Sequence, residues 1–265
     1  MVLFKQQLRS DRGNLIGWAI GLAALTWFMV IMYDSLTASG TLHDLMAALQ
    51  AMPAAMQAWL AGGTPIVTFS GFVAGTLYGA TLPVLLAIYV GLYAPSIVTR
   101  DVDQHNMEFL LSLPVRRASV IVCRWSAFVA GLAGLLSIQW LTVVAVSGGR
   151  GDAVRYLIAD LNLFLLFATV GGLLMFVTVF IDDQSRGLGA SMAIALGLYY
   201  VYLLTEQAKG ILLKLRGALP FAHFVSGDII SFGKVPWGDL VGLAVAALVL
   251  LAATVVAFER KQIAV

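Results

Sequence analysis

Charged side chains are scarce in this sequence of 265 residues. Asp, Glu, Lys and Arg together make up 11% of it, against roughly 25% in an ordinary globular domain. Apolar residues make up 60%, and the mean hydropathy is +0.92. So little polar surface does not cover a water-soluble particle of this size. The composition therefore predicts an integral membrane protein.

Cysteine and histidine are nearly absent as well. A single cysteine, Cys123, excludes a disulfide within the chain. Three histidines with one cysteine provide no zinc framework. The formal net charge of +2 gives no basic excess for binding nucleic acid. We therefore expect no metal site, no cofactor held by this chain and no nucleic-acid partner.

Motifs for nucleotide binding and hydrolysis are also missing. The one Gly-Lys pair, Gly233-Lys234, is followed by Val235 rather than Ser or Thr, so no Walker-type phosphate loop exists. Neither a G-x-S-x-G nor an H-E-x-x-H motif occurs. His105 and Glu108 are close in sequence, but this pattern is more typical of a solvated helix face than of a catalytic pair. We expect no catalytic residue and no enzyme activity in this chain.

Six long runs contain no charged residue, and a membrane-spanning helix needs about 20 mostly apolar residues. The runs predict an all-α polytopic fold in a single transmembrane domain, residues 1–265. The predicted spans lie at approximately residues 14–34, 66–97, 120–147, 161–181, 187–205 and 239–258. The second run is longer than a bilayer requires, which predicts a tilt, a kink at Pro83 or a protruding end.

The charge-free runs also bear on function. Proton-coupled carriers and voltage sensors usually need ionisable groups inside the membrane, and we expect none at that depth. A sodium-coupled carrier that uses backbone carbonyls stays open, although no internal repeat supports it.

Basic residues flanking the spans predict the orientation. With the N-terminus inside, ten of the sixteen Lys and Arg residues fall on the cytoplasmic side. The first exterior loop, residues 34–63, contains neither Lys nor Arg. We therefore expect a multi-pass protein of the inner (cytoplasmic) membrane with both termini in the cytoplasm.

Three segments between or before the spans have patterns of their own. An interfacial helix is predicted over residues 2–12, where basic residues share one face. An exterior helix over residues 42–60 should break at Pro53. The segment 206–239 is apolar between its charges, so we expect it to re-enter the outer leaflet in part and to turn at Pro220. The basic residues of the interfacial helix are Lys5, Arg9 and Arg12.

Small residues recur at four-residue spacing, most clearly at Gly71, Gly75 and Gly79. This spacing lets membrane helices approach closely. It is typical of packing within one chain, which we favour here, and also of a dimer seam or a moving interface.

The loop between the second and third spans, residues 100–117, predicts a short helix that stops before Pro114. Apolar residues including Phe109 and Leu113 share one face, and Glu108 belongs to the opposite one. An acidic face does not suit anionic lipid, so the pattern favours a protein partner over a membrane surface.

The string Glu-Phe-Leu-Leu-Ser-Leu-Pro-Val-Arg-Arg, residues 108–117, resembles the signature of type-2 ABC transporter permeases. In that family it also lies between the second and third spans. The six spans, the basic N-terminal segment and the apolar last exterior loop correspond too. Many members have Gly-Thr before the Glu, where this chain has Asn106-Met107.

The resemblance implies the transmembrane subunit of an ABC exporter for an amphipathic or hydrophobic substrate. It implies two copies of an ABC ATPase subunit, which bind ATP and Mg²⁺, and a second copy of this permease or a related one. The loop would be the cytoplasmic coupling helix. The implied docking residues are Asp103, His105, Asn106, Glu108, Phe109, Leu110, Leu113, Arg116 and Arg117.

A second hypothesis is a non-transporting membrane subunit that transmits ATPase motion or senses an exterior partner. A sizeable internal cavity would favour transport. A solid interior packed through glycines would favour transmission.

Overall fold

The computed structural model describes residues 2–53, 68–103, 117–181, 183–205 and 216–260. Within these ranges every regular element is a helix. Six helical stretches are long and apolar enough to cross a membrane, which confirms the predicted fold class. They are Asp11–Ala38, Phe69–Pro95, Ala118–Ser147, Ala153–Thr178, Gln184–Thr205 and Trp237–Arg260. Helices form here because lipid cannot satisfy backbone polar groups, and an α-helix satisfies them internally.

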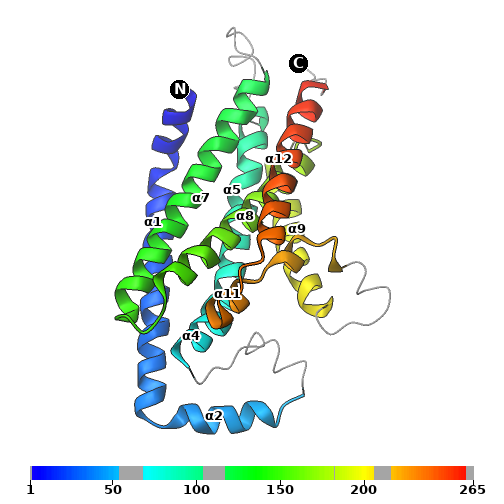
Figure 1. Cartoon of the computed structure of the whole chain (residues 1–265). Coiled ribbons are helices and arrows are strands. Elements are labelled where there is room, and N and C mark those ends of the chain that lie inside the picture. The colour runs from blue at the N-terminus through cyan, green and yellow to red at the C-terminus, as the bar shows by residue number, and fades with distance from the viewer. Residues whose placement is uncertain (1, 54–67, 104–116, 182, 206–215, 261–265) are drawn as a thin grey trace.

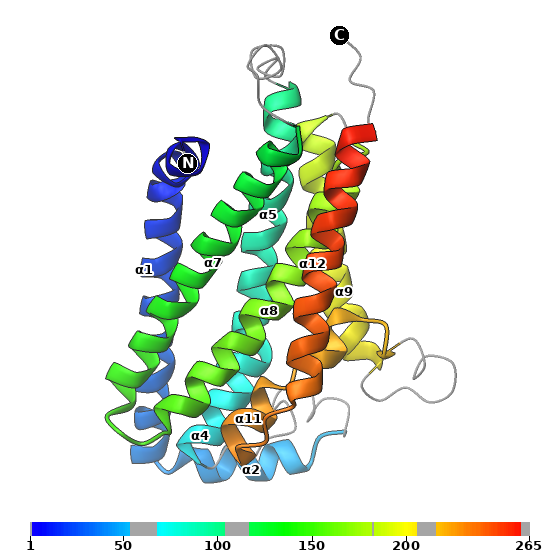
Figure 2. The same cartoon turned by 45° about the horizontal axis from the view of Figure 1, so that its top comes forward.

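The long helices run side by side along one direction (Figures 1 and 2). We call one end of this bundle the terminal end, because the first helix begins there and the last helix ends there. The end of α5, the start of α7 and the turn between α8 and α9 lie at the same end. The opposite end, with α2, α4 and α11, is called the loop end. The long helices are α1 (Val2–Ala38), α5 (Leu82–Asp103), α7 (Arg117–Ser147), α8 (Ala153–Thr178), α9 (Gln184–Thr205) and α12 (Trp237–Arg260).

Helix α8 is at the centre of the packing. It contacts α5, α7, α9, α11 and α12, while α1 packs mainly on α7. Large side chains with no exposed surface fill the space between these helices, which leaves the outer faces of α1, α9 and α12 to lipid. They include Leu77, Tyr78, Leu86, Phe128, Leu166 and Phe167.

The second span is irregular just before Pro83. It begins with α4 (Phe69–Phe72), continues as a π-helix, η1 (Val73–Thr81), and becomes α-helical in α5. Pro83 has no N–H to donate to the carbonyl of Gly79, four residues earlier. The hydroxyl of Tyr199 on α9 donates to this oxygen instead, at 3.3 Å. The disturbance at the proline is thus absorbed by a change of helix type and a contact from α9.

The basic N-terminal segment that we expected as an interfacial helix forms the first part of α1, which continues without a break from Val2 to Ala38. The side chain of Arg12 is exposed. Its neighbour Asp11 accepts a hydrogen bond of 2.5 Å from the hydroxyl of Tyr93 on α5. This contact ties the start of the first span to the end of the second.

The predicted exterior helix corresponds to α2 (Thr41–Gln50), which ends three residues before Pro53. Residues 54–67 lie outside the described part of the chain. The short helix η2 (Pro220–His223) begins at the predicted turn residue Pro220 and is followed by α11 (Ser226–Phe232). Both pack against α8 at the loop end.

One side chain of α8 anchors this last segment. The amide of Asn162 donates to the carbonyl of His223 at 3.1 Å. Its oxygen accepts the N–H of Val225 at 3.1 Å and the hydroxyl of Ser226 at 3.2 Å. Asn162 is completely buried, so the segment between α9 and α12 is fixed to the bundle by hydrogen bonds as well as by apolar contacts.

Helix α8 differs from its predicted span. It begins at Ala153, eight residues before the expected start at 161, and the carboxylate of Asp152 caps it by accepting the N–H of Val154 at 2.9 Å. The helix therefore contains Arg155 and Asp160. The charge-free run that begins at residue 161 is therefore only part of α8, and Asp160, one residue before it, is buried in the bundle.

Candidate functional site

The predicted docking segment is bracketed by two helix ends. Helix α5 ends at Asp103 and α7 begins at Arg117, and both ends lie at the terminal end of the bundle (Figure 1). The structure thus places the segment's two attachment points at the same end of the bundle as the start of α1 and the end of α12. The other predicted docking residues lie outside the described part of the chain: His105, Asn106, Glu108, Phe109, Leu110, Leu113 and Arg116. The side chains of Lys5 and Arg9 also lie outside it.

The glycines of the second span lie inside the chain. Gly71 and Gly75 are buried and Gly79 is half-buried. Gly17 and Gly21 on α1 differ, because a Cβ built on either would meet nothing within 4 Å. Close packing within this chain therefore involves the second span, whereas the small residues of α1 leave an open surface.

That open surface is a groove between α1 and α5 with a volume of about 380 Å³. Glycines form part of its wall, and Trp18 and Leu85 border it. Apart from Asn14, its lining is apolar or glycine. The lining residues are Gly13, Asn14, Gly17, Trp18, Gly21, Leu22, Leu25 and Leu85.

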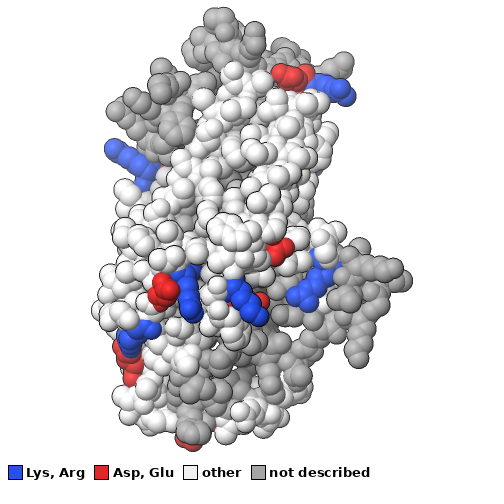
Figure 3. Space-filling model, viewed as in Figure 1, with Lys and Arg blue, Asp and Glu red and all other residues white. Residues whose placement is uncertain are grey.

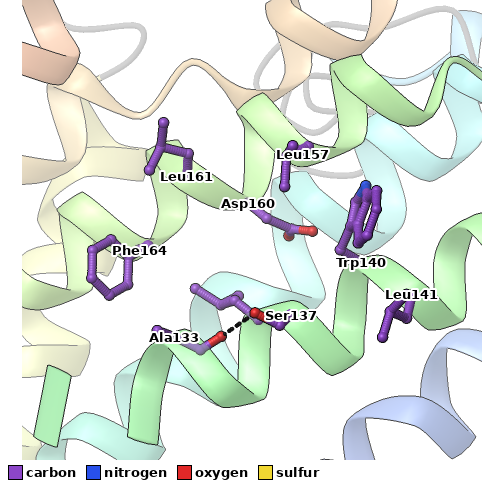
Figure 4. A pocket seen from close by; sticks show the side chains of 9 residues that line it. Ala133, Ser137, Trp140, Leu141, Leu157, Asp160, Leu161 and Phe164 are labelled. Carbon is purple, nitrogen blue, oxygen red and sulfur yellow. Dashed lines mark hydrogen bonds between the residues drawn. The ribbon is translucent and has the colours of Figure 1, made fainter. Parts of the chain in front are cut away.

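A second pocket, of about 370 Å³, opens between α7 and α8 in the half of the bundle nearer the loop end. Its walls are largely apolar, and one carboxylate points into it from α8 (Figure 4). The lining residues are Ala133, Leu136, Ser137, Trp140, Leu141, Leu157, Asp160, Leu161 and Phe164.

The carboxylate belongs to Asp160, which is 3% exposed. Neither of its oxygens accepts a hydrogen bond from a described group. The buried hydroxyl of Tyr78 lies close enough to interact with this carboxylate, although the pair does not meet the distance and angle of a regular hydrogen bond. A buried acid with a single neutral hydroxyl beside it is only weakly compensated and therefore costly, and such groups in membrane proteins are usually functional.

Sequence reasoning missed Asp160 because it searched for runs without charge, and the fourth run begins at the next residue. A helical pattern was present. Tyr156, Leu163 and Phe167 lie four residues before, three after and seven after Asp160, and all are buried. These positions share one helix face, so continuing the periodicity toward the N-terminus would have placed Asp160 on the buried side.

Trp140 has a fixed position in the wall of this pocket. Its indole Nε1 donates a hydrogen bond of 2.9 Å to the carbonyl of Ala153, in the first turn of α8. The hydroxyl of Ser137, by contrast, donates to Ala133 within its own helix at 2.7 Å (Figure 4). The indole is thus held against α8 by a contact that links the two helices lining the pocket.

On the face of Figure 3, a few charged side chains lie near the terminal end and more lie across the half nearer the loop end, with an uncharged band between the two groups. Near the loop end Arg150 pairs with Asp34, and its guanidinium lies 4.4 Å from the centre of the Phe69 ring. The hydrogen bond from Arg150 to Asp34 raises the pKa of the guanidinium above its ordinary value. The pair is exposed, so it marks the edge of the apolar band rather than a strong stabilising contact.

Among the described residues, no three His, Cys, Asp or Glu side chains gather closely enough to hold a metal ion. No protein-family model matches the chain, and no curated protein is detectably similar to it in sequence. The chain is thus a multi-pass membrane protein, with six helices that are long and apolar enough to span the bilayer.

Proposed function

We propose that this chain is the permease subunit of an ABC transporter that exports an amphipathic or hydrophobic substrate. A separate subunit would bind ATP with Mg²⁺ and hydrolyse it. The supporting observation is the position of the motif at residues 108–117. It connects the second and third spans at the end of the bundle where both termini lie. In the proposal this end faces the cytoplasm of a cell whose inner membrane holds the protein.

The helices that flank the motif favour a mechanical role for it. Helix α5 runs for 22 residues up to Asp103 and packs on α8 and α9. Helix α7 runs for 31 residues from Arg117 and packs on α1 and α8. A displacement at the terminal end would therefore reach most of the bundle through two continuous helices. Such a displacement requires that the ATPase bind one arrangement of the permease more tightly than the other.

The interior of the single chain is filled by large side chains, so the proposed substrate pathway runs between two permease copies. The groove between α1 and α5 supports this arrangement because it is apolar, open and on the outside of the chain. A second copy of this chain, or a related permease, would form the other wall of the pathway.

The alternative is a non-transporting subunit that passes ATPase motion to a partner beyond the membrane. The same filled interior is the observation that favours it. An ATP-dependent flux of substrate across proteoliposomes distinguishes the two functions, because a transmitting subunit couples hydrolysis to no flux.

The test begins with a search of the neighbouring genes for an ABC ATPase, which is then co-expressed with the chain, purified and reconstituted. We expect a complex of two ATPase and two permease subunits. We expect ATP hydrolysis from the complex and none from this chain alone. Hydrolysis by the isolated chain, or an ATPase that never co-purifies with it, would contradict the proposal.

A further inference from the structure

The pocket between α7 and α8 has a chemistry that the proposed function does not explain. Its one ionisable lining residue, Asp160, lies seven residues into α8, about 10 Å from the start of the helix at 1.5 Å per residue. The carboxylate is buried and lacks a hydrogen-bond partner among the described groups. A buried carboxylate in a low-dielectric site is stabilised most strongly by a positive charge close to it, and the pocket lining supplies none.

The rest of the pocket is suited to an apolar body attached to such a charge. Trp140 presents an indole, the best ring for binding a cation through its face, and its position is fixed by the hydrogen bond to Ala153. Phe164 adds a second ring, and the remaining wall is mostly aliphatic. A volume of about 370 Å³ falls within the range of sites for small organic molecules.

The pocket is reached from the membrane rather than from water. Leu141, Leu157 and Leu161 border it and are 56%, 49% and 44% exposed. They belong to helices long and apolar enough to span a bilayer, and in such a bilayer lipid would cover them. A ligand must therefore partition into the bilayer before it enters the pocket.

We propose that this pocket binds a lipophilic monocation, such as a quaternary ammonium or phosphonium with aromatic substituents. The charge lies between Asp160 and the indole of Trp140, and the apolar substituents lie against Phe164 and the aliphatic wall. The headgroup of an aminolipid fits less well, because its phosphate would approach the same carboxylate and no Lys or Arg lines the pocket. The proposal does not rest on the permease function, since it concerns binding to this chain alone.

The test measures binding of radiolabelled tetraphenylphosphonium to the purified full chain in maltoside micelles. We expect saturable binding of one cation per chain. Asp160→Asn keeps the shape of the side chain and removes its charge, so affinity should fall at least about tenfold. Trp140→Leu should lower affinity about threefold to tenfold, as expected for loss of one cation–π contact.

Two comparisons separate this site from general attraction to the micelle. Asp152→Asn removes the same charge eight residues earlier on the same helix and retains a side chain that can cap it, so affinity should stay within about twofold. Tetraphenylborate has the shape of the probe and the opposite charge, and it should not compete.

Variants that disturb folding are identified by size-exclusion profile and melting temperature. Should Asp160→Asn fail these checks, Ala133→Leu fills the pocket with the carboxylate intact and should also weaken binding. Binding as tight in Asp160→Asn and in Ala133→Leu as in the wild type would overturn the proposal. It would equally be overturned if phosphatidylethanolamine displaced the cation from mixed micelles while dioleoylglycerol, which lacks a headgroup amine and phosphate, did not.

Discussion

The hydroxyl of Thr26 on α1 donates a hydrogen bond of 2.8 Å to the side-chain oxygen of Gln139 on α7, and both side chains are completely buried. The two residues are 113 positions apart. The other side chains that α1 and α7 bury in the core are mostly apolar, and apolar contacts have no preferred direction. A directed polar contact therefore sets the register between the first and third spans.

Replacing Thr26 by Val keeps the shape and leaves the oxygen of Gln139 without its partner. Hydrogen bonds between membrane helices contribute about 0.6 kcal/mol on average and up to about 1.7, so unfolding in mixed detergent–SDS micelles should become easier by that amount. Thr142→Val is the control, because this hydroxyl donates to Ile138 within α7 itself. Equal losses in both variants would contradict the assignment.

Replacing Asn162 should destabilise the protein more than replacing Thr26. Asn162→Leu removes three hydrogen bonds to the segment after α9 and leaves buried backbone groups unpaired, which costs about 1–3 kcal/mol for each unsatisfied group. Proteolysis within the segment that contains η2 and α11 should become faster. Ser226→Ala removes only the hydroxyl that contacts Ala159 and Asn162, so its effect should be smaller. A protected segment in Asn162→Leu would show that apolar packing alone holds it.

Close packing between α7 and α8 is tested at Gly171. A Cβ there would lie 2.5 Å from ring atoms of Phe128 and 3.3 Å from a methyl of Val90. Gly171→Ala should destabilise the bundle by about 1–3 kcal/mol, the usual cost of overpacking. A Cβ at Gly134 on α7 would meet nothing within 4 Å. Gly134→Ala should therefore change the free energy of unfolding by less than about 0.5 kcal/mol. The unfolding curves of the two variants give the comparison directly.

How far the sequence predicts this protein depends on which physical effect fixes each feature. The spans follow from composition because lipid demands long apolar helices. The expected fifth span, 187–205, and the observed helix Gln184–Thr205 differ only at one end. Asp160 was missed because counting charges ignores which face of a helix a residue occupies.

Other features depend on contacts that no local pattern reveals. The carbonyl of Gly79, in the π-helix before Pro83, accepts a hydrogen bond from Tyr199, 120 residues away. Thr26 and Gln139 are 113 positions apart, and no sequence motif predicts their contact. The docking segment, in contrast, has a motif and lies outside the described residues, so its role stays a prediction.

Topology can be tested in a Cys123→Ser background, where each introduced cysteine is the only thiol. Gln50 and Gly217 are exposed, and Ser185 is exposed in the first turn of α9, which begins at the terminal end. A membrane-impermeant maleimide should label Gln50→Cys and Gly217→Cys in intact cells. It should label Ser185→Cys and Asn106→Cys only after the membrane is opened. External labelling of Asn106→Cys would overturn the predicted cytoplasmic position of the docking segment.

The docking segment itself is tested by two kinds of change. The double variant Phe109→Ala with Leu113→Ala removes apolar contact with the proposed ATPase, worth roughly 1.5–3 kcal/mol for each buried side chain. Co-purification of the ATPase should therefore fall sharply. Glu108→Ala should leave more of the complex intact and reduce stimulated hydrolysis, because an oriented charge sets register more than affinity.

Membrane insertion should not change in either case, since the segment connects two spans and belongs to neither. Arg12→Ala is a matched control at the same end of the bundle, where an exposed basic side chain is removed outside the motif. A loss of assembly in the apolar double variant and a loss of stimulated hydrolysis in Glu108→Ala would be specific effects. General misfolding would instead lower assembly and hydrolysis together in all three variants. Wild-type assembly and stimulated turnover in both motif variants would mean that the ATPase docks elsewhere. The motif would then no longer support the permease function.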